Sequence, residues 1–467
     1  IVYKTINRLY GDGLIYRGER IVNFCPRCGT SFSQLEVEYV ERDDPLYYLD
    51  YGPVTIATVR PETIFADVAV AVNPKDIRYK ELIGKTAKLP IVGRSLPIIA
   101  DSLVDPNFGT GALKVTPGHD ATDFEIGQKH KLPIISVIDN DGKMTNTPQK
   151  YVGTISEKAR NQIVEDLTKA NKIKKIETLH HSVGTCYRDK GLIQPLVSKQ
   201  WYLKVESLAK KALSAIRKRE IKFAAERYEK LAKHWLQNLR DWNISRQIVW
   251  GMRIPAWRCQ RCLEWTITEG EIPNKCKKCE HEKLIQDTDT FDTWFSSSQW
   301  PYATLQSSKG RDFEYFYPTS LMETAYEILP FWVIRMIMLG IYTTKENPFK
   351  DVLIHGLVRD AHGEKISKSK GNVIDPMLMT DKYGADALRM GIIWAALVET
   401  DISLSEDNIR GQRNFANKIW NVARFVFMEL PGKRRKRNEN DIKIIKELKT
   451  TIRKATRLLN SYRLNEA

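Results

Sequence analysis

The sequence has no uninterrupted apolar run long enough to cross a membrane. Its longest apolar stretch, residues 329–342 (LPFWVIRMIMLGIY), contains Arg335 and is shorter than the roughly 20 residues that a spanning helix needs. The first residues, IVYKTINRLYGDG, lack the apolar core and the small-residue cleavage site of a secretory signal. The sequence therefore predicts no membrane partner and a cytoplasmic location. It also begins with Ile1 rather than Met, as expected of an internal piece of a longer protein.

Acidic residues are fewer than basic ones. The 467 residues include 73 Lys and Arg against 57 Asp and Glu, which gives a net charge of +16. Such an excess favours a polyanionic partner, because each neutralised phosphate releases counterions. General solubility is the alternative explanation, and composition alone does not separate the two.

Cysteines are also scarce, and their spacing argues against disulfides. Six of the seven lie in Cys-x-x-Cys pairs, which in a basic chain indicate zinc. Two pairs follow each other closely and predict a four-thiolate structural zinc ribbon. Its ligands would be Cys259, Cys262, Cys276 and Cys279.

A second set of cysteines is incomplete. Cys25 and Cys28 pair naturally with Cys186, but Asp189 stands where a fourth cysteine is expected. Aspartate binds zinc through oxygen, although thiolate-rich sites seldom use it. A knuckle that keeps its shape without metal is the alternative.

The texture of the sequence changes twice. Short β-branched runs punctuated by Gly and Pro fill residues 48–180 and predict a β-rich domain. Long helical stretches alternating with short strands follow, as in an α/β domain, and amphipathic helices begin near residue 403. The β-rich block therefore resembles an insertion into one α/β domain.

A lysine-rich loop follows the strand-like run VLIHGLVRD. Residues 363–372 read GEKISKSKGN, and lysines with serine hydroxyls beside glycines suit phosphate binding. Many solvated loops share this composition, so the context matters. His355 and Gly356 end the preceding strand-like run.

This loop resembles the KMSKS loop of class I aminoacyl-tRNA synthetases, with Ile366 in place of Met. The segments NFCPRCGTSFSQLEVEY, ATVRPETIFADVAVAVNP, HSVGTCYR, LVSKQWY, DWNISRQIVWGMRIPAW, DTWFSSSQWP and YPTSLMETAYEILPFWVIRMIMLG are similar to valyl-tRNA synthetases, in the same order. The resemblance covers essentially the whole chain. It implies a class I Rossmann-type catalytic domain interrupted by a β-rich editing domain, with zinc knuckles and the start of a helical anticodon-binding domain.

The resemblance implies four segments. Residues 1–46 would be a catalytic segment with the first knuckle, and 47–182 the inserted editing domain. Residues 183–400 would be the second half of the catalytic domain, and 401–467 the start of the anticodon-binding domain. The implied function is valine–tRNA ligation: ATP-dependent charging of tRNA(Val) with valine, and hydrolytic editing of threonyl-tRNA. ATP, Mg²⁺ and Zn²⁺ would be the cofactors, and the ligase would act as a monomer.

The resemblance also assigns the adenylation residues. Lys365 and Lys368 would be catalytic, steadying the ATP phosphates. ATP would be bound by His355, Gly356, Lys365, Ser367, Lys368 and Ser369. Valine would be bound by Trp294, Glu327, Ile328 and Trp332, and the spacing of the last two predicts one helix face. None of the eight histidines forms the His-x-Gly-His motif of this class. We therefore expect this chain alone to be incompetent for adenylation.

A hydrophobic pocket cannot strongly reject an isostere that adds a hydroxyl, so such a ligase needs a second, hydrolytic site. Alternation along ALKVT predicts that Lys114 and Thr116 share a strand face, and Asp120 and Asp123 lie three apart at a helix start. By resemblance, Asp123 grips the amino group of the substrate and Asp120, as a buried partner, reads the threonyl hydroxyl. Lys114 and Thr116 would line the pocket near the ester. The implied editing residues are Thr58, Arg60, Thr63, Phe108, Lys114, Thr116, His119, Asp120 and Asp123.

Two alternatives stay open. The chain is also compatible with a piece of an isoleucyl- or leucyl-tRNA synthetase, which share the class. A different possibility is a non-catalytic zinc-ribbon protein that binds tRNA and descends from a synthetase. For Asp120, the plain structural alternative is a helix N-cap.

Overall fold

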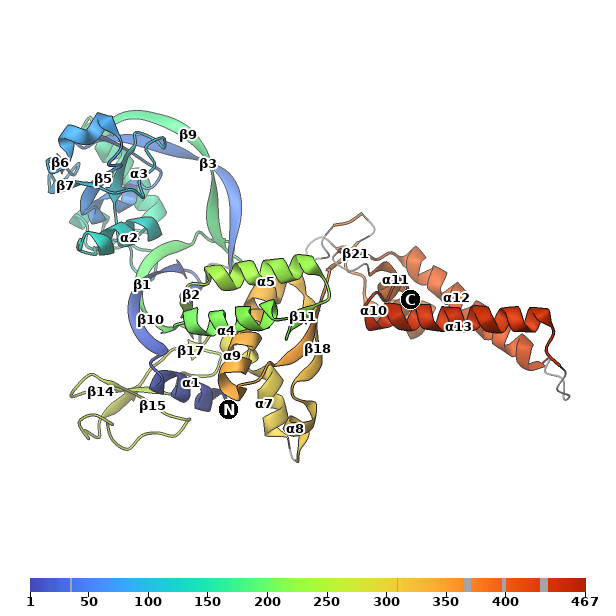
Figure 1. Ribbon diagram of the computed structural model, residues 1–467. Coiled ribbons are helices and arrows are strands. Elements are labelled where there is room, and N and C mark those ends of the chain that lie inside the picture. The colour runs from blue at the N-terminus through green and yellow to red at the C-terminus, as the bar shows by residue number, and fades with distance from the viewer. Residues whose placement is uncertain are drawn as a thin grey trace. The chain divides into compact units, whose positions relative to one another are not determined.

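The computed structural model describes residues 1–33, 36–308, 310–360, 362–364, 366, 371–396, 400–428 and 436–467. The chain divides into two compact units. Figure 1 labels its helices and strands and colours them from the N-terminus to the C-terminus. Unit 1 comprises Ile1–Thr5, Val205–Arg240 and Thr293–Ala467. Unit 2 comprises Ile6–Lys204 and Asp241–Asp292. The boundary falls within the first helix, α1 (Val2–Gly11). Unit 2 is thus larger than the inserted domain that the sequence predicts at residues 47–182, which it contains.

An antiparallel sheet of unit 2 has the strand order β12-β10-β1-β2. These strands are β1 (Ile15–Cys25), β2 (Thr30–Phe32), β10 (Gln194–Leu203) and β12 (Trp242–Asn243). Ile15 pairs with Leu203 and Phe24 with Gln194, so β1 and β10 run together along nearly their whole length. The apolar side chains Val22, Phe24 and Leu196 are buried in one core cluster. Chain segments on either side of residues 47–182 therefore pair with each other.

Two long strands lead into and out of the β-rich region, a name we use for residues 47–182. β3 (Val37–Asp50) and β9 (Ile173–Cys186) pair antiparallel, from Val37 opposite Cys186 to Leu49 opposite Ile173. Figure 1 shows them as a long arched ribbon. The short strand β4 (Thr55–Thr58) pairs with the other edge of β3.

The β-rich region contains a four-stranded sheet of order β6-β7-β5-β8. The strands are β5 (Ala69–Val72), β6 (Thr86–Lys88), β7 (Ser95–Ala100) and β8 (Ala112–Val115). All four residues of β5 (AVAV) are buried, which explains its continuous apolar run. The helical elements of the region are η2 (Pro61–Ala66), η3 (Ile77–Leu82), α2 (Ala121–Lys129), η4 (Gln149–Tyr151) and α3 (Ser156–Lys169).

The remaining strands of unit 2 carry the second cysteine-rich segment. β14 (Ala256–Cys259) pairs antiparallel with both β15 (Trp265–Ile267) and β16 (Leu284–Gln286). The short strands β13 (Ser245–Arg246) and β17 (Thr290–Phe291) pair with each other just outside this ribbon.

Unit 1 contains the parallel sheet of the α/β fold. Its order is β11-β19-β18, with β11 (Lys222–Phe223), β18 (Thr319–Ala325) and β19 (Phe349–His355). The carboxyl ends of β18 and β19 lie side by side, because Ala325 pairs with His355. Helices of this part are α4 (Glu206–Arg217), α5 (Glu226–Asn238), α6 (Thr293–Ser297), α7 (Trp300–Ser307), α8 (Asp312–Phe316) and α9 (Ile334–Thr344).

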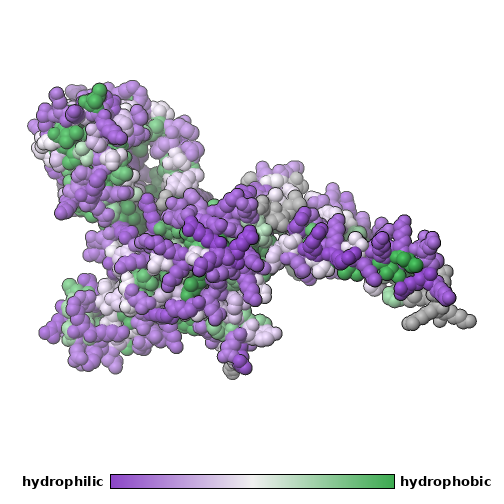
Figure 2. All heavy atoms as spheres, viewed as in Figure 1, coloured by the Kyte–Doolittle hydropathy of each residue, from purple (hydrophilic) through white to green (hydrophobic). Residues whose placement is uncertain are grey.

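The C-terminal part of unit 1 is mainly helical. It comprises β20 (Val358–Arg359), α10 (Pro376–Tyr383), α11 (Ala385–Ala395), β21 (Ile402–Ser403), α12 (Glu406–Met428) and α13 (Glu439–Asn460). Asn438 and Asp441 form a reciprocal capping box at the start of α13. Large apolar side chains of α12 and α13, among them Trp420 and Ile452, are exposed, and Figure 2 shows apolar atoms at the surface of these helices.

One helical run is longer than the apolar stretch that the sequence alone indicates. Residues Tyr326–Thr344 form 19 helical residues with a mean hydropathy of 1.3, which meets the length and composition of a membrane span. The apolar stretch taken from the sequence alone is shorter, because it leaves out the helical turn before residue 329. In the fold, 61% of this run is buried inside the protein, as in the core helix of a globular domain.

Candidate functional site

Lys114 on β8 ends in a buried cluster of polar side chains. Its Nζ donates to Thr63 Oγ1 at 2.9 Å, to Asp67 Oδ1 at 3.2 Å and to Thr116 Oγ1 at 2.6 Å. All four residues are buried. The sequence predicts that Lys114 and Thr116 share a strand face, and the short contact between them confirms it. The cluster joins the ends of β8 and η2.

Two members of this cluster are absent from the sequence prediction. Asp67 is the residue that ends η2, and its Oδ1 accepts a hydrogen bond from the hydroxyl of Thr116 at 2.7 Å. The hydroxyl of Tyr51 donates to Asp67 Oδ2 at 2.6 Å. Both side chains are fully buried. A sequence signal existed, since Asp67 is the one charged residue in the apolar run TIFADVAVAV.

Asp123 lies in the first turn of α2 and is only 4% exposed. Its Oδ2 accepts the backbone N–H of Thr116 at 2.9 Å. Its Oδ1 is buried, and no described residue donates a hydrogen bond to it. Burial, and then the charge of Asp120, raise the pKa of Asp123 to about 7, while Lys114 acts to lower it. Asp123 therefore presents one acceptor without a partner, the condition expected of a ligand contact.

Asp120 lies at the N-cap of α2 and is exposed. Its Oδ1 accepts the backbone N–H groups of Thr122 at 2.8 Å and Asp123 at 3.0 Å. This is the structural alternative considered above. The exposure differs from the buried position that the sequence analysis expects, because a residue that starts a surface helix keeps its side chain beside solvent.

His119 is buried, and one of its ring nitrogens is hydrogen-bonded to the backbone. Its Nε2 accepts the backbone N–H of Val137 at 2.8 Å. Burial, helped by the charges of Arg60 and Lys114, lowers the pKa of His119 to about 3, so the ring is neutral. Gly118 beside it has no room for a side chain, since an added Cβ would lie 2.1 Å from the carbonyl oxygen of Ile135.

Arg60 binds the backbone of the segment that contains Gly118 and His119. Its guanidinium donates to the carbonyl of His119 at 3.1 Å and to Gln194 Oε1 at 2.6 Å. It also pairs with Glu62, a buried carboxylate that Arg160 contacts from α3. Thr58 Oγ1 accepts the backbone N–H of Arg60 at 3.1 Å. Arg60 and Thr58 thus act on the backbone around the cluster.

Phe108 stands apart from the other predicted editing residues. Its side chain is 51% exposed. None of the polar contacts of the Lys114 cluster described above involves its loop.

The four cysteines of the predicted ribbon converge. Cys259 Sγ lies 3.6 Å from Cys279 Sγ, and Cys262 Sγ lies 3.6 Å from Cys276 Sγ. All four sulfur atoms lie within 4.8 Å of one another. A tetrahedral zinc ion with Zn–S bonds of about 2.3 Å separates its sulfurs by roughly 3.8 Å. The cluster fits zinc, and its four thiolates would leave no open coordination position.

The second cysteine set also converges, and Asp189 lies within it. Cys28 Sγ lies 3.8 Å from Cys186 Sγ, and Cys25 Sγ lies 3.5 Å from Asp189 Oδ2. The four ligand atoms meet the same 4.8 Å criterion as the first set. Asp189 Oδ1 meanwhile accepts the N–H of Gly191 at 2.8 Å. A carboxylate oxygen therefore occupies the place of the missing fourth sulfur.

Two of the predicted ATP-binding residues, His355 and Gly356, lie at the carboxyl end of a parallel strand, where α/β sheets bind ligands. His355 ends β19, and its Nε2 lies 3.0 Å from Glu323 Oε1. Gly356 approaches the chain closely, since an added Cβ would lie 1.8 Å from the carbonyl oxygen of Thr400. Of the lysine loop, Lys365, Ser367, Lys368 and Ser369 lie outside the described residues.

The predicted valine residues follow β18, but their helix is irregular. Tyr326–Ile328 is a 3₁₀ turn, and Leu329–Val333, with Pro330 near its start, is a π-helix. The structure therefore has a 3₁₀ turn and a π-helix where the spacing predicts an α-helix, and the shared face of Ile328 and Trp332 stays a prediction.

Aromatic contacts nevertheless join this helix to α6. The ring of Trp294 stacks on Phe331 with centroids 5.2 Å apart. Trp332 Nε1 donates to the carbonyl of Ser297 at 3.0 Å. Glu327 is exposed. Phe331 is an aromatic neighbour that the sequence analysis did not select.

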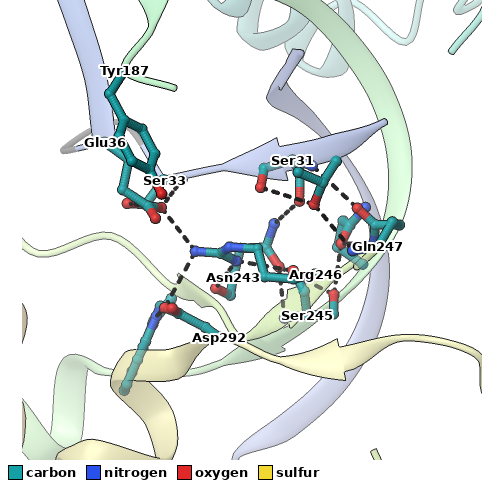
Figure 3. A network of polar contacts seen from close by, with 12 residues as sticks. Ser31, Ser33, Glu36, Tyr187, Asn243, Ser245, Arg246, Gln247 and Asp292 are labelled. Atoms are coloured by element: carbon teal, nitrogen blue, oxygen red, sulfur yellow. Dashed lines mark hydrogen bonds and ion pairs between the residues drawn. The ribbon is translucent and has the colours of Figure 1, made fainter. Parts of the chain in front are cut away.

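A buried arginine organises the DWNISRQ segment (Figure 3). Arg246 is 5% exposed and lies between two carboxylates, 3.0 Å from Glu36 and 3.3 Å from Asp292. It also donates to the backbone carbonyls of Asn243 and Ser245. A buried charge is stable only when paired and hydrogen-bonded in this way. Arg246 thus holds together three stretches of unit 2 that are far apart in sequence, those of Glu36, Arg246 itself and Asp292.

The chain combines a parallel α/β sheet, candidate nucleotide-site residues at the strand ends, a β-rich region and two cysteine clusters. This combination is that of a class I aminoacyl-tRNA synthetase. The family described as tRNA synthetases class I (I, L, M and V) matches residues 1–405, and the chain belongs to it.

Curated relatives narrow the resemblance further. A valine–tRNA ligase of Pseudothermotoga lettingae is 48% identical over 436 residues, which are 92% of this chain and 50% of the relative. A valine–tRNA ligase of Carboxydothermus hydrogenoformans is 46% identical over 479 residues, covering 100% of this chain and 54% of the relative. The chain spans about half the length of these relatives.

The fold also has a counterpart among solved structures. LeuRS of Agrobacterium radiobacter K84, in its ternary complex with tRNA and LeuAMS, matches with a TM-score of 0.52 at 17% identity. The match covers 99% of this chain and 66% of that chain. At this identity the likeness concerns the fold alone.

Proposed function

We propose that the chain is part of a valine–tRNA ligase, which uses ATP and Mg²⁺ to charge tRNA(Val) with valine and hydrolyses threonyl-tRNA in its β-rich region. Its curated relatives carry the ligase part of this proposal, with 46–48% identity over nearly the whole chain. The observation that carries the hydrolytic part is the unpaired Oδ1 of buried Asp123 beside the Lys114 cluster.

The chemistry of the hydrolytic site follows from its charges. An aminoacyl ester carries an ammonium group next to its carbonyl, and a buried carboxylate oxygen without a donor is a natural acceptor for it. In the proposed reaction, water adds to the carbonyl carbon, the bond to the ribose oxygen breaks, and that oxygen takes up a proton from the attacking water to become the ribose hydroxyl of the free tRNA. With His119 neutral and bound to the backbone of Val137, no side chain of the cluster is proposed as a nucleophile.

The adenylation residues form the second part of the proposal. His355 and Gly356 at the end of β19 would contact ATP, with Lys365 and Lys368 carrying the phosphate charge. Trp294, Ile328 and Trp332 would enclose the valine side chain.

Zinc would be structural in this protein. The four cysteines from 259 to 279 would hold one ion, and Cys25, Cys28, Cys186 and Asp189 would hold another. Both sets need reduced thiols, which suits the cytoplasm.

The decisive experiment measures the hydrolysis of threonyl-tRNA(Val) and valyl-tRNA(Val) by the 467-residue chain. The proposal expects threonyl-tRNA to be hydrolysed faster. Equal rates for both esters, or no hydrolysis of either, would refute the hydrolytic part. The Asp123→Asn variant is the matched control, because Asn can still accept the N–H of Thr116 but lacks the charge for the proposed ammonium contact.

A further inference from the structure

The hydrogen-bond capacity of Lys114 is fully used inside the cluster. An ammonium has three N–H donors, and three acceptors surround Nζ: Thr63 Oγ1, Asp67 Oδ1 and Thr116 Oγ1. None of these donors goes to Asp123, although the Lys114 charge acts on Asp123. The cation is therefore close enough to be felt by Asp123 but is bound to other groups.

The remaining members of the cluster are also committed. The hydroxyl of Thr63 donates to the carbonyl of Arg60 at 2.9 Å. The hydroxyl of Thr116 donates to Asp67 and accepts from Lys114. Asp67 uses both oxygens, since Tyr51 donates to the second one. Among the side chains of this cluster that the structure describes, the open acceptor is Asp123 Oδ1.

We propose that Asp67 is a positioning residue that sequesters the ammonium of Lys114, so that Lys114 cannot pair with Asp123 and Oδ1 stays available to the amino group of the substrate. The inference rests on the proposed hydrolytic function and adds to it a residue with a defined task. Asp67 does not touch substrate in this scheme and acts through Lys114 and Thr116.

Competition between two carboxylates for one cation explains why the arrangement needs Asp67. Lys114 is buried, and a buried ammonium requires a paired anion. If Asp67 lost its charge, Asp123 would remain as a buried carboxylate on which the charge of Lys114 acts. The freed ammonium would then pair with Oδ1 and block the site that the substrate amine needs.

The charges that face Asp123 are defined. Asp120 acts from the start of α2 and Asp67 from the end of η2, and both raise the pKa of Asp123. Lys114 acts from β8 in the opposite direction. His119, also close by, is neutral. Asp67→Asn removes an anion and frees a cation, so both effects lower the pKa of Asp123. Lys114→Met removes the cation and raises it.

The first test uses the full chain and threonyl-tRNA(Val). Asp67→Asn should raise KM by about tenfold or more, the effect of losing one charged hydrogen bond, with a smaller change in kcat. The double variant Asp67→Asn with Lys114→Met should recover part of that loss, since the competing ammonium is gone. If Asp67 were merely structural, the double variant would be no better than the single one.

The matched control is Asp166→Asn on α3. Asp166 accepts from a tyrosine hydroxyl, Tyr151 at 2.6 Å, and from a lysine, Lys150 at 2.7 Å, as Asp67 does. It lies outside the Lys114 cluster, so KM should stay at the wild-type value. An equal rise of KM in Asp166→Asn would overturn the inference.

The second test needs no hydrolysis, so it separates failure of the inference from failure of the proposed function. The Asp123 carboxyl is titrated by NMR on the full chain labelled with ¹³C-aspartate. The midpoint should fall in Asp67→Asn and rise in Lys114→Met, each by about one pH unit. Midpoints that move together, or do not move, would overturn the inference whatever the hydrolysis assay gives.

Discussion

Lys114 Nζ lies 2.6 Å from the hydroxyl oxygen of Thr116, two residues further along the chain. This contact fixes a buried cation at the end of β8, and the backbone N–H of the same threonine fixes Asp123. A cation and a carboxylate are thus held on one short segment without being paired. The electrostatic balance of the candidate hydrolytic site depends on that separation.

Hydrolysis should depend on pH through Asp123. Its pKa is raised to about 7 by burial, and the ionised form is the one that accepts an ammonium. The rate with threonyl-tRNA should therefore rise with pH through about 7 and fall below it. A rate measured from pH 5.5 to 8.5 checks this, and Asp123→Asn should abolish the rise.

Asp123→Asn should also stabilise the protein. A carboxyl whose folded pKa lies above its unfolded value disfavours the folded state once it ionises, so its stability contribution falls as pH rises from about 4 to 7. Asn can still accept the N–H of Thr116 but carries no charge. The variant should gain about 1–3 kcal/mol at pH 8 and nothing at pH 4. Thermal midpoints at the two pH values provide the measurement, and a loss of stability at pH 8 would contradict the argument.

Metal analysis should find two zinc ions per chain. Cys276→Ser should lose one ion and destabilise its ribbon, because a short ribbon depends on its metal for folding. Cys186→Ser should lose the other ion and leave the first in place. Elemental analysis of the three proteins checks this, and one equivalent in the undamaged wild type would exclude metal at the set that contains Asp189.

Strand periodicity was enough to predict that Lys114 and Thr116 meet. It could not reveal Asp67, because the partner of a buried lysine is chosen by how η2 packs on β8, 47 residues away in sequence. The hydrogen bond from Tyr51 to Asp67 could not be predicted for the same reason. The local Cys-x-x-Cys spacing predicted that Cys259, Cys262, Cys276 and Cys279 converge. The pairing of Cys25 and Cys28 with Cys186 and Asp189 is also confirmed, although 158 residues separate Cys28 from Cys186.

Local geometry explains the two differences. Spacing alone predicted an α-helix around Ile328 and Trp332, but Pro330 falls within a π-helix. Asp120 has the sequence context of either a buried reader or an N-cap, and only the fold shows that its carboxylate faces solvent while capping α2.

Gly118→Ala should disrupt the candidate site from within. The added Cβ would lie 2.1 Å from the carbonyl oxygen of Ile135, so the backbone next to His119 would have to shift. We expect a loss of about 2–4 kcal/mol and no measurable hydrolysis. Gly411→Ala on α12 is the control. Apart from its chain neighbours and the backbone of its own helix, no described atom lies within 4 Å of the added Cβ, and helix propensity should make the change neutral or slightly stabilising. Chemical denaturation of both variants gives the comparison.

Asp120 caps α2, and substitution with Asn or Ala separates this role from the predicted recognition of the threonyl hydroxyl. Asn retains the N-cap, so Asp120→Asn should keep wild-type stability, whereas Asp120→Ala should lose about 1 kcal/mol with the two backbone hydrogen bonds. If Asp120 also reads the threonyl hydroxyl, Asp120→Ala should reduce the preference for threonyl- over valyl-tRNA by about 1–3 kcal/mol. The Asn variant tests whether its charge matters: removing it should lower the pKa of Asp123 and move the pH profile of hydrolysis to lower pH. Chemical denaturation measures the two stabilities, and hydrolysis rates of both esters across pH measure the preference and the pH profile. Full discrimination by Asp120→Ala would leave the residue as a helix cap alone.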